Sequence, residues 1–434
     1  MDLIIQIAQL ILALSILVIL HEFGHFIPAR LFKIKVEKFF LFFDVKFALF
    51  KKKIGDTVYG VGWLPLGGYV KIAGMVDESM DKEQMEKPPE PWEFRSKPAW
   101  QRLIVMIGGV TVNVLLAWFL YSAMLVYYGD TYIPVNNLDG GIAVSEGGKA
   151  MGFQEGDQLL AVDDKEVYRF DKYLPMQVLL GDEATVERDG ERVTFAISDT
   201  GKKKVLEDQE PFIMVRANTR LAVVPDTTIA YAGGLRAGDK IVEINGAEAQ
   251  EWQDVLDQIK TGKGKDMAIS YEREGRLING SFYVPEGRPL GVLPEEPRVT
   301  QEFSVLESIP AGWDRTVGVL KGQIKQFKLI FNKEVKGYKQ VKGPIGIVGM
   351  MDPTWDWYKF WDFVAMFSVW LAFVNILPIP ALDGGHVMFL LYEMISGRAP
   401  SQKVLERGQI VGFVIVMGLM VIIFGNDIWN LFKN

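Results

Sequence analysis

The sequence predicts a polytopic α-helical membrane protein with four transmembrane helices and a polar insert between the second and the third. Two observations carry this prediction. Hydrophobic residues make up 49% of the 434-residue chain, and they gather in blocks that reach the roughly 20 residues a helix needs to cross a bilayer. The polar stretch between the second and third blocks repeats one pattern of strands and turns, which predicts two tandem α+β domains.

The four helices are placed by their apolar blocks, at residues 1–30, 101–128, 359–395 and 409–425. Prolines and glycines interrupt the third block. The first block has no basic residue before it and no small-residue cleavage site, so we expect a retained helix and not a signal peptide. The other segments are the loops 31–100 and 396–408, the connector 299–358 and the tail 426–434.

Basic residues beside the apolar blocks predict the orientation of the helices. They gather at the two loops 31–100 and 396–408, which we therefore expect to be cytoplasmic. These residues are Arg30, Lys33, Lys35, Lys38, Arg95, Lys97, Arg102, Arg398, Lys403 and Arg407. The opposite helix ends carry mainly aspartate, with Lys359 and Lys433 as exceptions, so both termini and the insert are expected outside.

Residues 55–74 are predicted to form a β-hairpin that re-enters the membrane. The run Val58–Gly74, VYGVGWLPLGGYVKIAG, places glycines among β-branched and aromatic residues around a Leu-Pro-Leu-Gly-Gly turn. Backbone at membrane depth must be shielded by protein or line a watery cavity. An exposed strand edge there would be a template for an unfolded chain segment. A hairpin on the protein surface is the alternative.

The insert contains one pattern twice. AMGFQEGDQLLAVDDKEV, Ala150–Val167, matches AGGLRAGDKIVEINGAEA, Ala232–Ala249, and later VERDGERV matches YEREGRLI. Each copy predicts a tight Gly-Asp turn, an apolar strand such as Lys240–Ile244, a second turn, a helix, and a hairpin with Asp-Gly or Glu-Gly at its turn.

GLRAGDKIVEING in the second copy resembles the signature of PDZ domains, which bind an extended peptide or chain end as an added strand. We therefore expect PDZ-like domains at residues 129–215 and 216–298. In the first copy Asp163-Asp164 replaces the usual turn, which is a departure from the PDZ pattern. Generic hairpins in an unrelated sandwich are the alternative.

The connector begins with a predicted amphipathic helix at Phe303–Phe331, which leads to VKGPIGIVGM, Val341–Met350. Such a helix can pack along the membrane surface. It can equally be a spacer that fixes the soluble domains relative to the third span. The sequence leaves both roles open.

Charge and composition narrow the function classes. The net charge of −7 and the lack of a concentrated basic face argue against a nucleic-acid partner. The chain has no cysteine, which excludes disulfides and thiolate metal ligands.

The far end of the first apolar helix carries VILHEFGHFIPAR, Val18–Arg30. His21 and His25 are four residues apart, so a helix brings them to one face with Glu22 beside them. This HExxH pattern is typical of zinc sites in which a water takes the open position and the glutamate accepts its proton. Polar groups in an apolar helix are usually functional. The alternative is a helix in which the two histidines only form ordinary hydrogen bonds and bind no metal.

The third apolar block supplies a candidate third ligand in NILPIPALDGGH, Asn375–His386. Asp383 is a carboxylate deep in an apolar segment, where Pro378 and Pro380 break the helix and two glycines loosen it. The broken helix can bring Asp383 to the metal. The alternative is a proline-kinked span in which this aspartate only caps a helix segment.

HExxH in a first span, NxxPxPxLDG in a later one and tandem PDZ-like domains between them resemble the site-2 protease family, in its bacterial form with four spans. The resemblance covers nearly the whole chain. It implies an intramembrane zinc metalloendopeptidase with His21, His25 and Asp383 as Zn²⁺ ligands and Glu22 as the catalytic base.

The resemblance also implies residues that bind the substrate. Asn375 matches an asparagine that holds the substrate backbone in the family. The hairpin, with Gly67, Gly68 and Tyr69 at its centre, is similar to the family's membrane-reentrant β element, which pairs with the unwound substrate.

Asn113 and His386 are two further polar residues in the apolar blocks. The second block reads GGVTVN, Gly108–Asn113, where relatives more often have Gly-Pro followed by Asn and Phe, so we expect Asn113 to pack and not to catalyse. His386 follows Asp383 by three residues. It can approach the metal or take an outer position, and the outer position is favoured because the family's carboxylate ligand is already present.

The resemblance implies a location and partners as well. The chain is expected in the bacterial inner membrane as a multi-pass protein of the stress response, with the PDZ domains and both termini in the periplasm. Its partners would be the lipid bilayer, single-span membrane substrates, and a peptide or substrate ectodomain near the PDZ domains. Anti-sigma factors and remnant signal peptides are the implied substrates, cut after prior trimming, with the PDZ tandem as a size filter. A direct grip on the new chain end is the rival account.

Two other functions fit parts of the sequence. A metalloprotease that cuts soluble or misfolded chains at the cytoplasmic face would need its third ligand in a soluble helix, where no convincing candidate is found. A non-enzymatic PDZ-type membrane receptor would carry a vestigial metal motif. The intact His21, Glu22, His25 and Asp383 argue against it.

Overall fold

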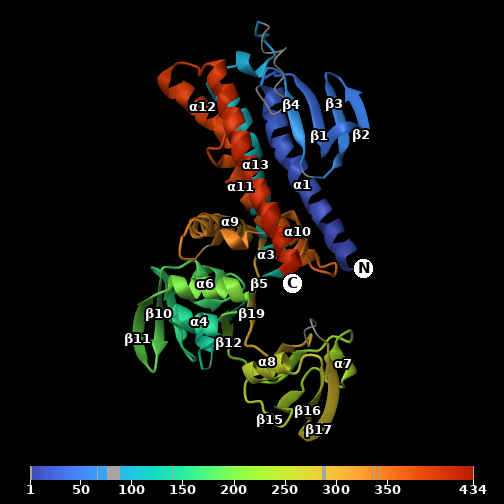
Figure 1. The fold of residues 1–434 in the computed structure, drawn as a ribbon, viewed down its shortest axis with the longest axis vertical. Helices are drawn as coiled ribbons and strands as arrows, with labels where there is room; N and C mark the ends of the chain where they lie inside the picture. Colours follow the sequence, from blue (N-terminus) through green and yellow to red (C-terminus); the bar gives the residue numbers. More distant parts are fainter. Residues whose placement is uncertain are drawn as a thin grey trace. The chain divides into compact units, whose positions relative to one another are not determined.

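The computed structural model describes residues 2–65, 67–75, 88–138, 140–285, 290–335, 337–341 and 343–433. The chain forms two compact units. The first consists of Met1–Gly129, Glu302–Phe327 and Tyr338–Asn434, and the second of Asp130–Gln301 and Lys328–Gly337. Figure 1 shows the helices and strands of both units, coloured along the chain.

The first unit is mainly helical. Four of its helices, α1 (Asp2–Leu31), α3 (Ala99–Tyr128), α11 (Trp357–Ile376) and α13 (Gln402–Lys433), are long and apolar enough to cross a membrane. This finding supports the predicted four-span class. The other helical elements of this part of the chain are η1 (Phe94–Ser96), α9 (Val305–Ile330), η3 (Gly337–Gln340), α10 (Pro344–Val348) and α12 (Asp383–Ser396).

The third apolar block is divided into two helices. α11 ends at Ile376 and α12 begins only at Asp383. Pro378 and Pro380 lie between them, and a proline lacks the amide donor that would continue a helix. The predicted block 359–395 is therefore one spanning helix followed by a separate shorter helix, and Asp383 is the first residue of the latter.

A four-stranded sheet lies between α1 and α3 in the chain. It consists of β1 (Val36–Leu41), β2 (Phe43–Ile54), β3 (Thr57–Leu64) and β4 (Tyr69–Ile72) in the order β2-β3-β1-β4. β2 and β3 form an antiparallel hairpin whose turn is Gly55-Asp56. β1 runs parallel to β3 and antiparallel to β4, so β4 is an edge strand.

This order corrects the hairpin predicted at residues 55–74. The segment does form two strands, β3 and β4, but β1 lies between them and they do not pair with each other. Phe39 and Phe40 of β1 are buried, and this apolar strand takes the centre of the sheet. The sequence pattern shows only neighbours along the chain, so it missed the crossover. Leu66, in the predicted turn, lies outside the described residues.

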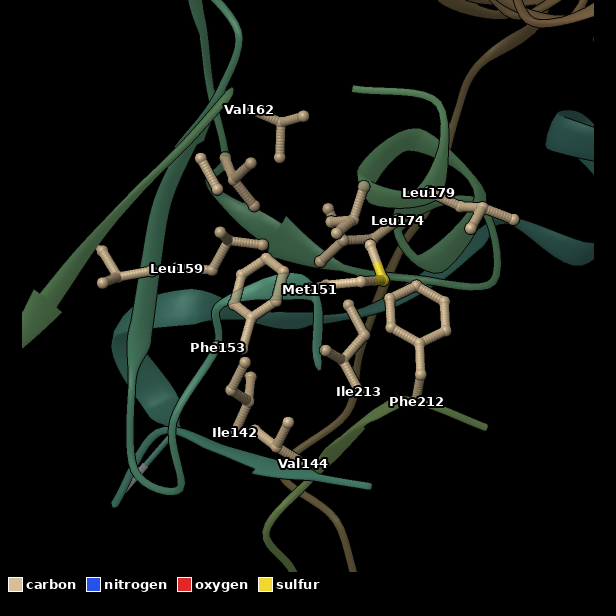
Figure 2. Close-up of a cluster of buried hydrophobic side chains, with 14 of the residues drawn as sticks. Ile142, Val144, Met151, Phe153, Leu159, Val162, Leu174, Leu179, Phe212 and Ile213 are labelled. Atoms are coloured by element: carbon tan, nitrogen blue, oxygen red, sulfur yellow. The ribbon is translucent and has the colours of Figure 1, made fainter. Parts of the chain in front are cut away.

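The second unit begins with an α+β lobe built on the sheet β11-β10-β7-β8. Its elements are β5 (Asp130–Pro134), η2 (Val135–Asn137), β6 (Ile142–Val144), α4 (Glu146–Met151), β7 (Gln158–Val162), β8 (Lys165–Glu166), β9 (Arg169–Phe170), α5 (Leu174–Leu179), β10 (Glu183–Arg188), β11 (Glu191–Ala196), α6 (Asp199–Asp208) and β12 (Ile213–Val215). Figure 2 shows its core, in which Met151 and Phe153 pack among side chains from β6, β7 and β12.

The rest of the second unit repeats this plan on the sheet β15-β14-β16-β17, with a separate buried core. Its elements are β13 (Leu221–Val223), α7 (Ile229–Ala232), β14 (Lys240–Ile244), β15 (Ala247–Glu248), α8 (Trp252–Thr261), β16 (Lys265–Arg273), β17 (Arg276–Val284), β18 (Leu293–Pro294) and β19 (Val299–Gln301). The strand predicted at Lys240–Ile244 is confirmed.

Both hairpins predicted from the duplicated pattern are also present. β10 and β11 are joined by Asp189-Gly190, and β16 and β17 by Glu274-Gly275. All four turn residues have positive φ, as a two-residue turn of type I′ requires. Whether the two lobes are PDZ domains stays a prediction.

Candidate metal centre

Helix α1 places the two histidines of the HExxH motif on one face. His21 and His25 lie one helical turn apart, with their ring centroids 4.9 Å from each other. His25 is buried and His21 is half-buried. The Nε2 atoms of the two rings approach to 3.3 Å, so both point at the same place.

Asp383 completes this arrangement from α12. Its Oδ2 lies 3.4 Å from His21 Nε2 and 3.3 Å from His25 Nε2, so the three atoms form a nearly equilateral triangle. Ligands held about 2.0–2.1 Å from a tetrahedral zinc ion are about 3.3 Å from one another. This oxygen is buried, and beyond the two imidazoles it has no hydrogen-bond partner within the described residues. The three residues are a group that can hold a metal ion.

The break before α12 puts Asp383 in place. The two glycines after it allow the chain to fold back: a Cβ on Gly384 would lie 2.2 Å from the carbonyl oxygen of Leu377, and one on Gly385 would lie 2.5 Å from Cα of Pro380. Ala381 in the break has φ of 92°, a conformation that non-glycine residues rarely adopt. Tight backbone contacts thus hold the first turn of α12 against the break.

Helix α3 approaches the histidines through glycines. A Cβ on Gly109 would lie 2.4 Å from His25 Nε2 and 2.6 Å from His21 Cε1. A Cβ on Gly108 would lie 1.9 Å from the carbonyl oxygen of Gly24 in α1. Only residues without a side chain permit this crossing, so the Gly-Gly pair of the GGVTVN segment has a steric role that the sequence pattern did not reveal.

Two residues of α3 contact the outer nitrogens of the imidazoles. His25 Nδ1 lies 2.8 Å from the carbonyl oxygen of Val105, to which it donates when protonated there. The Asn113 side chain lies 3.1 Å from His21 Nδ1, and Asn113 is fully buried. Sequence reasoning assigned Asn113 to packing. Its contact with a candidate ligand was not foreseen, because no spacing within α3 points to α1.

Asn375, near the end of α11, also reaches the site. Its side-chain nitrogen lies 3.4 Å from His21 Nε2. This residue is a predicted substrate-binding residue, and the structure brings it to the ligand triangle. His386 is not part of the group of possible metal ligands found among the described residues.

The edge strand β4 lies next to α1 at Glu22. The backbone N–H of Val70 donates a hydrogen bond to the Glu22 carboxylate. Just before it, a Cβ on Gly68 would lie 2.5 Å from the side chain of Val18 in α1. Tyr69 stacks on Phe40 and donates to Asp44 Oδ1 at 2.9 Å. Gly68 and Tyr69 therefore lie beside the metal centre, although the predicted hairpin pairing is wrong. Gly67 precedes them with φ of 154° and faces the ring of Phe43.

The chain is also similar to known protein families and proteins. The model of peptidase family M50 matches residues 9–419. The regulator of sigma-E protease RseP of Escherichia coli is 28% identical over 97% of this chain and 98% of its own length. The regulator of sigma E protease of Haemophilus influenzae is 28% identical over 98% and 99% of the two chains, and protease RseP of Yersinia pestis is 27% identical over the same shares.

Proposed function

The chain belongs to peptidase family M50, and we propose that it is an intramembrane zinc metalloendopeptidase of the site-2 type, which hydrolyses peptide bonds within the transmembrane segments of single-span proteins. The observation that carries this proposal is the triangle of His21 Nε2, His25 Nε2 and Asp383 Oδ2. Its sides match the ligand spacing of tetrahedral zinc. Two of its corners lie in α1, a helix apolar enough to span a membrane.

His21, His25 and Asp383 would hold the zinc ion. When bound, the ion supplies a Lewis acid that lowers the pKa of water and polarises the carbonyl to be attacked. Asp383 Oδ2 is buried and has no hydrogen-bond partner among the described residues other than the two imidazoles, which supports its assignment as a ligand. A buried carboxylate is costly unless a cation compensates its charge.

Glu22 is the proposed general base. It follows His21 directly in α1, and the amide of Val70 holds its carboxylate. From there it would take the proton of the attacking water and deliver it to the leaving amine nitrogen. Asn375, with its side-chain nitrogen 3.4 Å from His21 Nε2, would donate a hydrogen bond to a substrate carbonyl at the same place.

The substrate would bind as an added strand. A transmembrane helix hides its carbonyls in its own hydrogen bonds, so it must unwind before water can attack it. β4 has β1 on one side and no strand on the other in the described sheet, and it lies beside Glu22. Pairing with this edge at Gly67, Gly68 and Tyr69 would hold the unwound segment extended at the site.

The second unit would select the substrates. We propose that its two lobes are PDZ-like domains, in the periplasm of a bacterium, that exclude proteins with a bulky outer domain and admit those already trimmed. Anti-sigma factors and remnant signal peptides are the proposed substrates. The inner membrane, with both termini periplasmic, is the proposed location. The duplicated sheets and hairpins of the two lobes support a tandem of one domain type.

The test is zinc content and cleavage of a single-span model substrate in detergent, for the unaltered chain and three variants. Glu22→Gln should keep zinc and lose cleavage, Asp383→Ala should lose both, and His386→Ala should keep zinc. Cleavage by Glu22→Gln would refute the assigned base. An unaltered chain that binds no zinc would refute the enzyme and favour a PDZ-type receptor.

A further inference from the structure

The two ends of the Asn113 side-chain amide differ in their hydrogen bonding. Its Oδ1 is buried and has no hydrogen-bond partner among the described residues. Its Nδ2 lies 3.1 Å from His21 Nδ1. A buried polar atom without a partner is destabilising, and an amide of this shape fits the same space in either of two orientations.

The chemistry of His21 decides the orientation. A neutral imidazole has one N–H and one nitrogen that accepts. In the structure the amide nitrogens of both Asn113 and Asn375 approach His21, at Nδ1 and at Nε2. Both amides cannot donate to the same neutral ring. Because Nε2 is the atom that faces His25 and Asp383, its lone pair must stay free for a metal, and the proton must be on Nδ1.

A proton on Nδ1 needs an acceptor, and the oxygen of Asn113 is the atom available. The two ends of an amide have nearly the same shape, so their hydrogen bonds decide which is which. Rotating the amide by half a turn places Oδ1 against His21 Nδ1. This rotation gives the buried oxygen a partner and leaves Asn375 as the amide that donates to this ring among the described contacts, while the N–H groups of Asn113 move to the side where its oxygen stood.

The neighbouring histidine shows the same arrangement. Its Nδ1 lies 2.8 Å from the carbonyl oxygen of Val105. Val105 and Asn113 are two helical turns apart on α3, with Gly109 between them against both rings. α3 would then offer one oxygen to each imidazole, from the backbone for His25 and from a side chain for His21.

We propose that Asn113 is the positioning residue of His21. Its side-chain oxygen accepts the Nδ1–H, fixes the ring in the tautomer with a free Nε2, and so raises the affinity of the site for zinc. Partners of this kind hold the ring orientation and the tautomer of metal-binding histidines, and their loss typically lowers metal affinity about 10–100-fold. The inference rests on the proposed zinc site and adds a residue to it.

The first measurement is the tautomer itself, in metal-free protein labelled with ¹⁵N-histidine. The chain has only three histidines, and a His21→Ala sample identifies the signal of His21. We expect the proton of neutral His21 on Nδ1 in the unaltered chain and in Asn113→Asp. In Asn113→Leu this preference should be lost, while His25 keeps its own tautomer. A proton on Nε2 of His21 in the unaltered chain would overturn the proposal.

The second measurement is the zinc dissociation constant, from competition with a chelator. Asn113→Leu should weaken binding about 10–100-fold, and Asn113→Asp, whose carboxylate also accepts, should restore it. Ser368→Ala is the matched control, because Ser368 Oγ donates only to the backbone oxygen of Asn113, at 2.8 Å. It removes a neighbouring buried hydrogen bond and should leave the affinity unchanged.

The outcomes separate this proposal from the protease assignment. If the unaltered chain binds zinc and Asn113→Leu binds it equally well, the positioning role is wrong and the protease proposal stands. If Asn113→Asp is as weak as Asn113→Leu, the residue only packs. Should Asn113→Leu fail to fold, Asn113→Ala, which adds no bulk, takes its place under the same criteria.

Discussion

Gly109 determines how closely α3 can approach the metal centre. An added Cβ would lie 2.4 Å from His25 Nε2, which is one of the proposed ligand atoms. We predict that Gly109→Ala displaces this ring and lowers both zinc content and cleavage by at least tenfold, the loss expected for a disturbed metal-binding histidine. Atomic absorption on the purified protein and cleavage of a single-span substrate check this.

Gly418 provides the matched control for that change. It lies in α13, another helix able to span a membrane, and an added Cβ there meets nothing within 4 Å. Gly418→Ala should keep zinc and activity. Its effect on stability should be neutral or slightly favourable, because alanine has a higher helix propensity than glycine. If both variants lost zinc and activity equally, the effect of Gly109→Ala would not be due to the contact of α3 with the histidines but to a general sensitivity of helix glycines to substitution.

Among the elements, the edge strand β4 is the proposed link between the substrate and the candidate metal centre. Gly68 lets it approach α1, because a Cβ there would lie 2.5 Å from Val18 and 2.6 Å from the carbonyl oxygen of Phe40. We predict that Gly68→Ala moves the start of β4 away from α1 and raises KM for a transmembrane substrate severalfold while zinc content is unchanged. Steady-state kinetics on a single-span substrate test this. An unchanged KM would argue against strand pairing at this edge.

A second element, the Gly-Asp turn, is stabilised in the same way in both lobes. Asp157 in the first lobe pairs with Arg188, and Asp239 in the second pairs with Arg273, each through two hydrogen bonds of 2.7 and 2.8 Å. Both carboxylates are fully buried. Hydrogen bonding to them raises the pKa of each arginine. The Gly-Asp pattern in the sequence thus marks a buried ion pair and a turn together.

This pair leads to a prediction for the first lobe. Arg188→Leu leaves the buried Asp157 carboxylate without its cation, which should lower the free energy of unfolding of that lobe by about 3–5 kcal/mol. Hydrogen exchange of the β10 and β11 amides in the full chain measures the loss. Arg192→Leu, on β11 and without a described ion pair, is the control and should change exchange little. Equal protection in both variants would contradict the prediction.

At the scale of the whole molecule, the insert begins and ends at paired strands. β5 and β19 are antiparallel, and Asp130 lies opposite Gln301. Partners in such a pair are about 5 Å apart, so a short glycine linker can replace residues 131–300 without stretching the chain. Excision of the insert can therefore test the proposal that it selects the substrates.

We predict that the excised chain keeps its zinc, still cleaves a trimmed substrate and now also cleaves the untrimmed one. The reason is that a size filter acts by exclusion, so its removal widens the range of substrates. Gel analysis of trimmed and untrimmed forms of one substrate measures this. Loss of cleavage of the trimmed form, with zinc retained, would instead favour domains that grip the new chain end.

The class of the protein and its candidate ligands follow from the amino-acid sequence alone. Apolar length predicted the helices, because a bilayer sets the number of residues required. His21, Glu22 and His25 could be grouped because helix periodicity fixes where residues four apart point. Asp383 stood out as a carboxylate in an apolar segment that prolines break. The duplicated hairpins followed from turn residues that need positive φ.

The contacts around these groups are visible in the folded chain alone. The β1 crossover between β3 and β4 and the approach of α3 to both histidines are contacts between segments far apart in the chain. So are the positions of Gly109 and Asn113 against the imidazole rings. The physical reason is that local periodicity and turn chemistry act over a few residues, whereas strand order and helix crossings are chosen by packing of the whole unit.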